Sequence, residues 1–481
     1  MIRDAQGHLL SGATLEAATH FDQGVRAFTL AYGDAIGRFD AARQTSPDCA
    51  MAHLGKAWIY ALANDALMMP AGCALLKSAG ALPLNEREAA HAAALAHAVL
   101  GHRAAAVAIL DRHLMHYPCD LLGHYAAMLL DAFQGRFPSV RDRSARALPR
   151  WAKSQPGYGI MLAFYGFGLE EAGNYARSEE TSRAAAEMEP HGYWPHHAVS
   201  HVMEMTGRPD DGLAWMDIRA PLWSAKENAN RVHIWWHKAL FHIELGQYDA
   251  ALQIYDGPVL ATQKPMGISL TNASALLWRL EMLGFEAGNR WEQVAELWEG
   301  HADGRLCVFA DIHAAMAALR AGRGKEVEHL LAAMRATASD TTEAAPTYRD
   351  IGLPVVQGLA AFQEQAYADA VQHLLPARVN LWKMGGSHAQ RDIIDWTLTE
   401  AAARAGQRDV ALSLAHERLA MRPDSAPNKR FLSAAEAIDL TMIAQINHGR
   451  LAHRCKFKLN GPCQRRFCRF LRSSSWRRRA P

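Results

Sequence analysis

The sequence predicts an all-α fold of about eleven tetratricopeptide-like helical hairpins, stacked in a right-handed superhelix that can curl around a central cavity. Three observations support this prediction. Helix-favouring residues dominate, long β-branched runs are scarce, and small residues, glycine and proline recur with a period near 34 residues. The chain is 50% hydrophobic and 21% charged, which is typical of a folded protein with a buried core.

The repeat is clearest from Gly159 onwards. Gly166, Gly173, Ala185 and Pro190 fall at positions 8, 15, 27 and 32 of a tetratricopeptide unit. Small residues let the two helices of a hairpin approach, glycine ends the first helix with a positive φ, and proline cannot continue the second helix. The same register predicts hairpins that start near residues 16, 49, 87, 121, 159, 193, 232, 274, 308, 351 and 392.

We expect three segments: an N-terminal leader over 1–15, the repeat superhelix over 16–440, and a basic tail over 441–481. Residues 448–481 contain 11 Lys and Arg and no acidic residue, which leaves 40 basic and 49 acidic residues before them. Such a composition cannot build a core, so we interpret the tail as a disordered extension. The alternative is an arm for nucleic acid or an anionic surface, since aromatic residues lie among the arginines.

Composition and motifs also exclude several classes of protein. The N-terminus has no basic and apolar signal pattern, and no run approaches the ~18 apolar residues of a membrane span. We therefore expect a cytoplasmic protein with no membrane partner, and we do not expect nucleic acid as a partner of the array. Seven dispersed cysteines indicate reduced thiols rather than a disulfide framework. The sequence contains no Walker A loop, dinucleotide fingerprint, GxSxG elbow or CxxC pair.

The stretch "YWPHHAVSHVMEM", residues 193–205, holds the main candidate site. Positions 2, 5, 9 and 12 of a first helix share one inward stripe, because they are spaced by three and four residues. In the unit from 193 these positions are Trp194, His197, His201 and Glu204, and the unit from 232 begins its stripe with His233 and Trp236. We expect His233 to meet the first set, whereas His196 at position 4 should pack against a neighbouring helix.

Three interpretations of this stripe remain open. His197, His201 and His233 are candidate ligands of a divalent metal, although no complete zinc spacing such as HExxH is present. Alternatively, His197 or His201 acts as a general base oriented by Glu204, with tryptophans as an apolar wall. The third interpretation is that these residues only pack between helices, as half-buried histidines often do.

Weaker candidates lie further along the chain. Trp278 falls on its unit's stripe with Arg279 beside it, and an arginine there could bind a carboxylate or pair with a neighbour. Asp311 and His313 lie close to the stripe of the unit from 308.

The segment "LWKMGGSHAQRDIIDW", residues 381–396, places His388, Arg391 and Asp392 at a helix start. A helix N-terminus with these residues can hold an anion, or Asp392 can simply stabilise the first helical turn.

Several longer motifs resemble one family. They are "YGIMLAFYGFGLEEAGNYARSEETSRAAAEMEPHGYWPHHAVSHVMEM", "WWHKALFHIELGQYDAALQIYD", "LLWRLEMLG", "FADIHAAMA" and "GGSHAQRD". Over about residues 10–435 the chain resembles the tetratricopeptide repeat protein 38 family. The resemblance implies a cytosolic, all-helical superhelical protein and carries over no reaction. It implies the following candidate groove residues: His197, His201, Glu204, His233, His237, Asp311, His313, His388, Arg391 and Asp392.

Two functions follow from these patterns. The first is a cavity lined by histidine, tryptophan and acids that binds a small molecule and can be catalytic. The alternative is a scaffold for a peptide or protein partner, which predicts an open groove with binding residues spread along many repeats. Histidine and tryptophan concentrated in consecutive units favour the small-molecule cavity.

Overall fold

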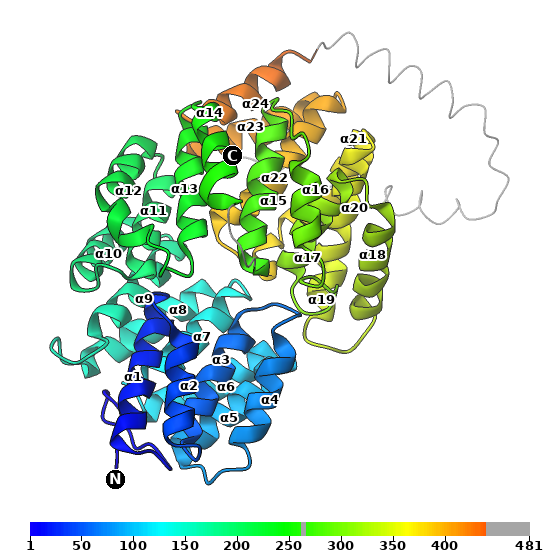
Figure 1. Ribbon diagram of the computed structural model, residues 1–481. Helices are drawn as coiled ribbons and strands as arrows, with labels where there is room; N and C mark the ends of the chain where they lie inside the picture. Colours follow the sequence, from blue (N-terminus) through cyan, green and yellow to red (C-terminus); the bar gives the residue numbers. More distant parts are fainter. Residues whose placement is uncertain (261–265, 439–481) are drawn as a thin grey trace, which may run out of the picture. The chain divides into compact units, whose positions relative to one another are not determined.

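A computed structural model describes residues 1–260 and 266–438 of the chain (Figure 1). Met1–Ala435 form one compact unit, which contains the whole array of hairpins. The predicted basic tail, 441–481, lies outside the described residues.

Eleven helical hairpins follow one another in the described ranges, and each pairs a first helix with a second. They are α1 (Leu15–Leu30) with α2 (Ala35–Thr45), α3 (Ala50–Leu62) with α4 (Met69–Ala79), α5 (Glu86–Val99) with α6 (Arg103–His116), α7 (Leu121–Ala132) with α8 (Phe137–Ala147), α9 (Tyr158–Glu171) with α10 (Tyr175–Met188), α11 (Tyr193–Met205) with α12 (Pro209–Trp223), α13 (Arg231–Glu244) with α14 (Tyr248–Ile254), α15 (Gly267–Met282) with α16 (Arg290–Leu297), α17 (Val308–Arg320) with α18 (Gly324–Ala338), α20 (Leu353–Gln363) with α21 (Tyr367–Arg378), and α22 (His388–Arg404) with α23 (Arg408–Met421). Short turns of 3-10 helix (Leu148–Arg150, Leu381–Met384) and π-helix (Tyr255–Val259, Tyr348–Gly352), together with α19 (Ala345–Thr347), join some of them, and α24 (Ala426–Glu436) follows the last.

This arrangement confirms the predicted all-α, tetratricopeptide-like array. Most first helices start within two residues of the expected position, but α15 starts at Gly267 instead of 274 and α22 at His388 instead of 392. The α15 backbone begins early because the buried carboxylate of Asp65, from the second hairpin, accepts the Gly267 N–H at 2.9 Å. A capping box between Ser387 and Gln390 starts α22.

Small residues act in the array as the repeat pattern predicts. Gly173 has a φ of +79° and ends α9, a conformation that other residues rarely adopt. Gly166 lies where α9 and α10 are closely packed, since a Cβ there would be 2.2 Å from Ser182 Oγ. The local sequence therefore sets both the end of the first helix and the tight packing of the hairpin.

The array curls so that its early hairpins contact much later ones. Asn64 Nδ2 donates to Cys307 Sγ at 2.9 Å, and Arg103 Nη2 donates to the Leu306 carbonyl at 2.7 Å. Asp65 also accepts from His301 Nδ1 at 2.7 Å. These contacts join residues some 200 or more positions apart, and they confirm the prediction that the array encloses a central space.

The residues before α1 are packed against the array. Asp4 is buried and forms an ion pair with Arg87 of α5 at 2.8 Å. Among the described helices there is none that combines the length and apolar character needed to cross a membrane.

Candidate functional site

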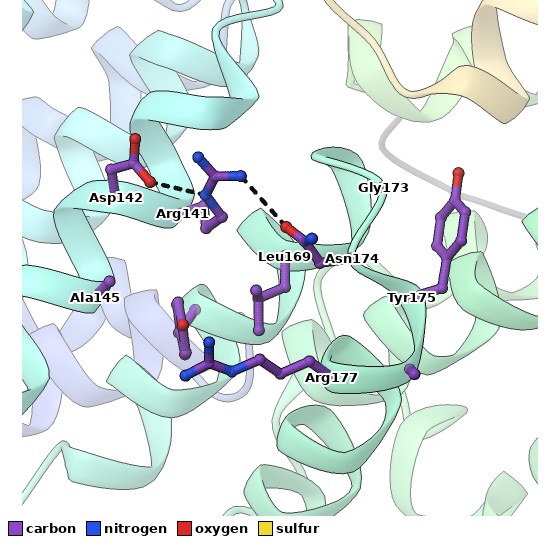
Figure 2. A pocket seen from close by; sticks show the side chains of 10 residues that line it. Arg141, Asp142, Ala145, Leu169, Gly173, Asn174, Tyr175 and Arg177 are labelled. Carbon is purple, nitrogen blue, oxygen red and sulfur yellow. Dashed lines mark hydrogen bonds and ion pairs between the residues drawn. The ribbon is translucent and has the colours of Figure 1, made fainter.

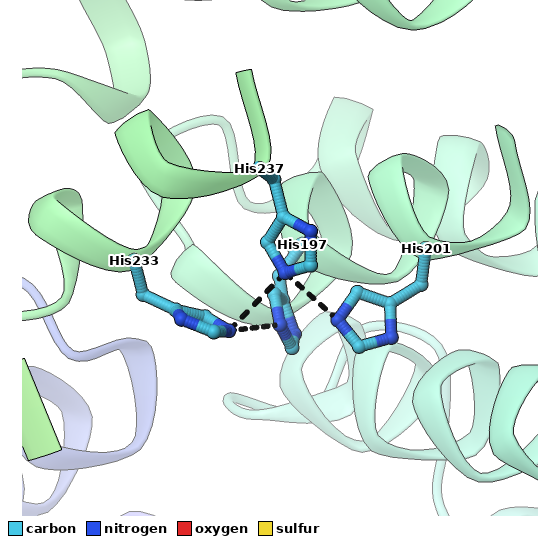
Figure 3. A group of neighbouring side chains, drawn as sticks. All are labelled: His197, His201, His233 and His237. Atoms are coloured by element: carbon cyan, nitrogen blue, oxygen red, sulfur yellow. Dashed lines mark hydrogen bonds between the residues drawn. The ribbon is translucent and has the colours of Figure 1, made fainter. Parts of the chain in front are cut away.

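Two neighbouring first helices carry a cluster of four histidines. Helix α11 supplies His197 and His201 one turn apart, and α13 supplies His233 and His237 with the same spacing. The four imidazoles point toward one another between the two helices (Figure 3). Three of them are buried, and His233 is half-buried. The structure thus brings His233 to His197 and His201, as the stripe predicts, and adds His237.

The Nε2 atoms of the four rings converge. His197 Nε2 lies 3.0 Å from His233 Nε2, which lies 3.2 Å from His237 Nε2, which in turn lies 3.0 Å from His201 Nε2. One ligand atom from each ring falls within 4.8 Å of those of the other three. The cluster is therefore compact enough for one ion or a short chain of protons.

Two carboxylates of α9 hold the far side of His201. Its Nδ1 lies 3.1 Å from Glu170 Oε2 and 3.1 Å from Glu171 Oε1, and both glutamates are buried. Carboxylate oxygens accept hydrogen bonds, so Nδ1 of His201 carries a proton and donates it. A second histidine, His388 of α22, approaches Glu171 with its Nδ1 at 3.4 Å from Oε2.

The α13 histidines have the same arrangement. His237 Nδ1 donates to Glu204 Oε2 at 3.1 Å, and His233 Nδ1 donates to the amide oxygen of Asn272 at 2.7 Å. Because an oxygen fixes the proton on Nδ1, the Nε2 lone pair of each ring points into the cluster. Glu204 therefore orients His237, and not His197 or His201 as the general-base interpretation proposed.

Burial disfavours charge on most of these rings. Burial, followed by repulsion from the other imidazoles, holds the pKa of His197 and that of His237 well below the usual range. Burial also lowers the pKa of His233 to about 4. Burial acts in the same direction on His201, but its carboxylate partners outweigh it and raise the pKa of His201 to about 10. His201 is thus the one ring of the four whose surroundings favour the charged form.

Glu204 links the cluster to the last hairpin. Arg422 Nη1 lies 3.7 Å from Glu204 Oε1 and 3.2 Å from Glu244 Oε1, while Arg422 Nη2 lies 2.9 Å from Asp392 Oδ2. Burial raises the pKa of Glu204 to about 7, although Arg422 acts in the opposite direction. Arg422, which follows α23, therefore joins acidic residues of α11, α13 and α22 in one network of charges.

A cavity of about 400 Å³ lies beside the cluster. Most of its lining comes from the first helices α1, α3, α7, α9, α11, α13, α15, α17 and α22, and residues of the second helices α2 and α8 also contribute. Most lining side chains are apolar, and nine of them are aromatic: Phe28, Tyr60, Tyr125, Phe133, Phe137, Phe167, Tyr193, Trp194 and Phe309. The polar part includes His197, His233 and Asn272, so two of the four histidines border the cavity. His201 and His237 lie behind them, outside the lining.

The remaining predicted residues of α11 and α13 support the cluster. Trp194 lines the cavity, as the apolar-wall interpretation expects. Trp236 instead stacks on the ring of His233 with centroids 5.2 Å apart and is buried. His196 packs away from the cluster, where its Nε2 donates to the Pro190 carbonyl at 2.8 Å and its ring contacts Trp215. The prediction that His196 packs against a neighbouring helix is confirmed.

Trp278 and Arg279 of α15 lie in the core rather than among the cavity residues. Trp278 Nε1 donates to Thr397 Oγ1 at 3.0 Å. The guanidinium of Arg279 lies 5.6 Å and 5.7 Å from the ring centres of Trp236 and Trp396. Arg279 also donates to the Ala389 carbonyl at 2.9 Å, so its hydrogen bonds join α15 to α22.

Asp311 and His313 of α17 also serve local packing. Asp311 is buried, and it accepts from the Gly304 N–H at 3.0 Å and from the Tyr348 hydroxyl at 2.6 Å. His313 Nδ1 donates to the Phe309 carbonyl at 2.7 Å, one helical turn earlier. Neither residue is among those that line the described cavity, whereas their neighbours Phe309 and Ala310 are.

The helix start at 388 also differs from the expected anion site. Ser387 caps its own helix, and Arg391 donates to the Gly386 carbonyl. Asp392 does not cap the first turn. Its carboxylate forms ion pairs instead with Arg418 of α23, at 2.6 Å from Nη1, and with Arg422, which follows α23. These groups are occupied by protein partners, so the geometry favours a structural role over anion binding.

Sequence reasoning missed Glu170, Glu171 and Arg422 as partners of the cluster. Glu170 falls at position 12 of the unit from 159, which is the position that Glu204 occupies in the next unit. The stripe rule applied one hairpin earlier would have found Glu170. No comparable signal marks Arg422, because it follows the second helix of the last hairpin.

A second hollow, of about 710 Å³, lies between α8 and the α9–α10 hairpin (Figure 2). Its charged side chains bind one another: Arg141 Nε donates to Asp142 at 2.7 Å, and Arg141 Nη1 donates to the Asn174 amide oxygen at 3.3 Å. Arg177 lies over the ring of Tyr165 at 5.3 Å. Although larger, this hollow contains no converging group of titratable side chains, so the histidine-bordered cavity is the stronger candidate site.

No family model matches this chain. Among solved structures, the human IFIT1 dimer with PPP-AAAA is 14% identical over 86% of this chain and 93% of that chain, with a TM-score of 0.41. The human IFIT1 dimer with m7Gppp-AAAA is 14% identical over 87% and 94%, with a TM-score of 0.42. A monomeric IFIT1 mutant with Gppp-AAAA is 13% identical over 87% and 95%, with a TM-score of 0.39. Likenesses this weak say nothing about what the present chain binds.

Proposed function

We propose that the central cavity binds one small, mainly apolar molecule, with a polar group of that molecule turned toward His197, His233 and Asn272. The observation that carries this proposal is the opening of two imidazoles onto a largely apolar cavity. Its volume, about 400 Å³, falls within the ~300–1,000 Å³ of typical ligand pockets. Apolar lining would supply affinity, and the few polar groups would fix the orientation of the ligand.

A catalytic role for this site would use the histidines that reach the cavity. His197 and His233 border it, whereas His201 is separated from it by the other rings and bound to two glutamates. Proton transfer needs hydrogen-bond reach or one bridging water. We therefore assign contact with the ligand to His197 and His233, and support of these two rings to His201, His237 and Glu204.

The alternative of a peptide-binding scaffold needs an open groove that follows many repeats. The cavity here is bounded by helices from α1 to α22, and hydrogen bonds join the early hairpins to the later ones. This closure favours a small molecule over an extended peptide. The resemblance to the tetratricopeptide repeat protein 38 family belongs to the same proposal and is supported by the motifs around 193–205 and 235–256. A cytoplasmic location is part of the proposal as well.

Two matched variants test the proposal. Ala132 lines the cavity and Ala145 lines the outer hollow, so Ala132→Phe fills the first and Ala145→Phe fills the second. The probe is N-phenyl-1-naphthylamine, a neutral aromatic dye that fluoresces in apolar surroundings. We expect saturable binding of one dye per chain in the wild type and in Ala145→Phe, and at least tenfold weaker binding in Ala132→Phe.

Circular dichroism of both variants checks that the helices form. Native mass spectrometry of the purified chain, before and after dye addition, counts the bound molecules. The proposal fails if the dye binds Ala132→Phe as tightly as the wild type, or if binding is lost only in Ala145→Phe. A labelled single-stranded RNA oligonucleotide, for which we expect no saturable binding, tests the expectation that nucleic acid is not a partner.

A further inference from the structure

Two other groups of histidines and carboxylates lie close together in the described residues, and one of them provides a comparison. His91, His113 and Asp120 are buried, and both histidines approach the same oxygen, Asp120 Oδ2, at 2.9 Å. His91 Nδ1 accepts the Trp58 indole N–H at 3.1 Å, so the proton of His91 is on Nε2 and is donated to Asp120. Arg87 Nε donates to the same carboxylate at 2.7 Å. In this group every contact joins an N–H donor to the Asp120 carboxylate, so no metal ion is needed to balance it.

The centre of the four-histidine cluster differs, because ring nitrogens face one another there and no carboxylate of the described residues lies between them. In His201, His233 and His237 the Nδ1 proton is donated outward to an oxygen, so each ring in its neutral form presents an Nε2 lone pair to the centre. Three acceptor nitrogens in a row, 3.0 and 3.2 Å apart, repel one another unless a positive charge lies between them. Burial removes the water that would otherwise donate to His201 and His237.

Protons can occupy these contacts only if one buried ring is charged. A neutral His197 with its proton on Nε2 can donate to His233, and a charged His201 can donate from Nε2 to His237. The middle contact, His233 Nε2 to His237 Nε2 at 3.2 Å, still joins two lone pairs. Moving the charge to His237 removes that repulsion, but its single Nε2 proton is then shared between His233 and His201. One cation bound by all four Nε2 atoms satisfies all of the contacts at once.

We infer that His197, His201, His233 and His237 together bind one divalent transition-metal ion of the zinc class through their Nε2 atoms. A tetrahedral ion with metal–nitrogen bonds of ~2.0–2.1 Å places its ligands roughly 3.3 Å apart. The observed separations along the chain of contacts, 3.0, 3.2 and 3.0 Å, need only a small expansion to reach that value. Imidazole ligands suit Zn²⁺, Cu²⁺, Ni²⁺ and Fe²⁺, and do not suit Mg²⁺ or Ca²⁺.

The surroundings of three of the four rings fit this assignment, whereas Nδ1 of His197 is buried without a hydrogen-bond partner among the described residues. Histidines that bind metals usually donate their other ring N–H to a carboxylate or carbonyl oxygen, which fixes the ring and makes Nε2 more basic. Glu170 and Glu171 do this for His201, Glu204 does it for His237, and the Asn272 amide oxygen does it for His233. The inference extends the proposed function, because His197 and His233 border the ligand cavity, but the metal site itself does not depend on a ligand in that cavity.

A competing set of ligands is the group Glu170, Glu171 and His201, which also lie within reach of one ion. An ion there would use Nδ1 of His201, so that Nε2 of His201 carries the ring proton, and the lone pairs of His233 and His237 would still face each other at 3.2 Å. Since Nδ1 already donates to both carboxylates, the structure favours the four-nitrogen site. The two sets share only His201, so variants can distinguish them.

The test uses the full-length chain, stripped with a chelator and then supplied with Zn²⁺ or, separately, Co²⁺. Elemental mass spectrometry should find one zinc per chain after dialysis. Co²⁺ should give the visible d–d bands of a tetrahedral site with nitrogen ligands and no near-ultraviolet thiolate band. A thiolate band, or a chain that stays free of metal after zinc addition, overturns the inference.

Single variants locate the ion. His237→Gln should abolish the Co²⁺ spectrum, Glu204→Gln should weaken zinc binding tenfold to a hundredfold by releasing His237, and His113→Gln in the comparison group should leave one zinc per chain. If Glu170→Gln combined with Glu171→Gln removes the ion and His237→Gln retains it, the site is the carboxylate set and the inference is wrong.

Two further measurements serve as controls, one for folding and one for binding of the dye. Circular dichroism checks each variant, and if His237→Gln does not fold, the Co²⁺ spectrum of the wild type decides by itself between nitrogen and sulfur ligands. Ala132→Phe fills the cavity and should keep one zinc per chain. Loss of dye binding with zinc retained therefore tests the proposed function alone, and absence of zinc with dye binding intact overturns the metal site alone.

Discussion

The buried carboxyl of Asp311 gives the clearest prediction of pH-dependent stability, and Asp311→Asn is the change that tests it. Burial raises the pKa of Asp311 to about 7, although hydrogen bonds from Tyr348 and Gly304 act in the opposite direction. In the unfolded chain the pKa of this carboxyl returns to the ordinary value near ~3.9. The folded state therefore holds a proton that the unfolded state has lost between these two values.

The sign follows from proton linkage. A group that binds more protons in the folded state contributes stability that is fully present below the unfolded pKa and is lost as the pH rises through the folded pKa. About three pKa units correspond to roughly 4 kcal/mol of unfolding free energy, lost between about pH 4 and pH 7. Asparagine keeps the size of the side chain, can still accept from Gly304, and can donate to Tyr348 without titrating.

The assay is urea unfolding followed by tryptophan fluorescence, at a series of pH values from 4 to 8. Other buried carboxyls contribute to the slope of both proteins, so the difference between Asp311→Asn and the wild type isolates Asp311. That difference should rise in favour of the variant by up to about 4 kcal/mol between pH 4 and pH 7. Tyr348→Phe removes a donor that lowers the pKa of Asp311, so it should move the wild-type slope to higher pH. Parallel stability curves for the wild type and Asp311→Asn would refute the reasoning.

Three further predictions concern stability. Asp120→Asn should lower the unfolding free energy by about 3–5 kcal/mol, because it leaves a buried arginine and two histidines short of their shared anion, and urea unfolding at neutral pH measures this loss. Gly166→Ala should cost about 1–3 kcal/mol through the clash with Ser182 Oγ, and Ser182→Ala in the same chain should restore most of it; additive effects of the two changes would contradict the contact. Deleting 448–481 should leave the melting temperature unchanged in a thermal scan, since the composition of that segment cannot build a core, and a lower melting temperature would contradict that interpretation.

Much of the fold is encoded locally, and this explains why the sequence predicts it well. Helix propensity, glycine at the end of a first helix and small residues at the hairpin contact all act within one 34-residue unit. The starts at 121, 193 and 308 are therefore predicted to the residue. The start of α15 is missed by seven residues because the group that caps it, Asp65, comes from the second hairpin.

The candidate site is predicted in part for the same reason. The stripe of α11 places His197, His201 and Glu204 on one face, and the next hairpin brings His233 to them. The same rule also selects Trp278, and it places Asp311 close to the stripe of its unit, but the structure gives both residues packing roles. Helical periodicity specifies a face, but it does not specify whether that face meets a cavity or another helix.

The sequence by itself determined the all-α repeat, the register of its hairpins and the pair of helices that carries the histidines. Only the tertiary structure decided which side of each imidazole meets an oxygen, that Glu170 and Glu171 complete the support of His201, and that the early hairpins close the cavity against the later ones. The physical reason is the separation along the chain over which each effect acts. Propensity and helical phase act over a few residues, whereas the direction of a histidine's hydrogen bonds and the closure of a cavity depend on groups that the curl of the whole array brings together.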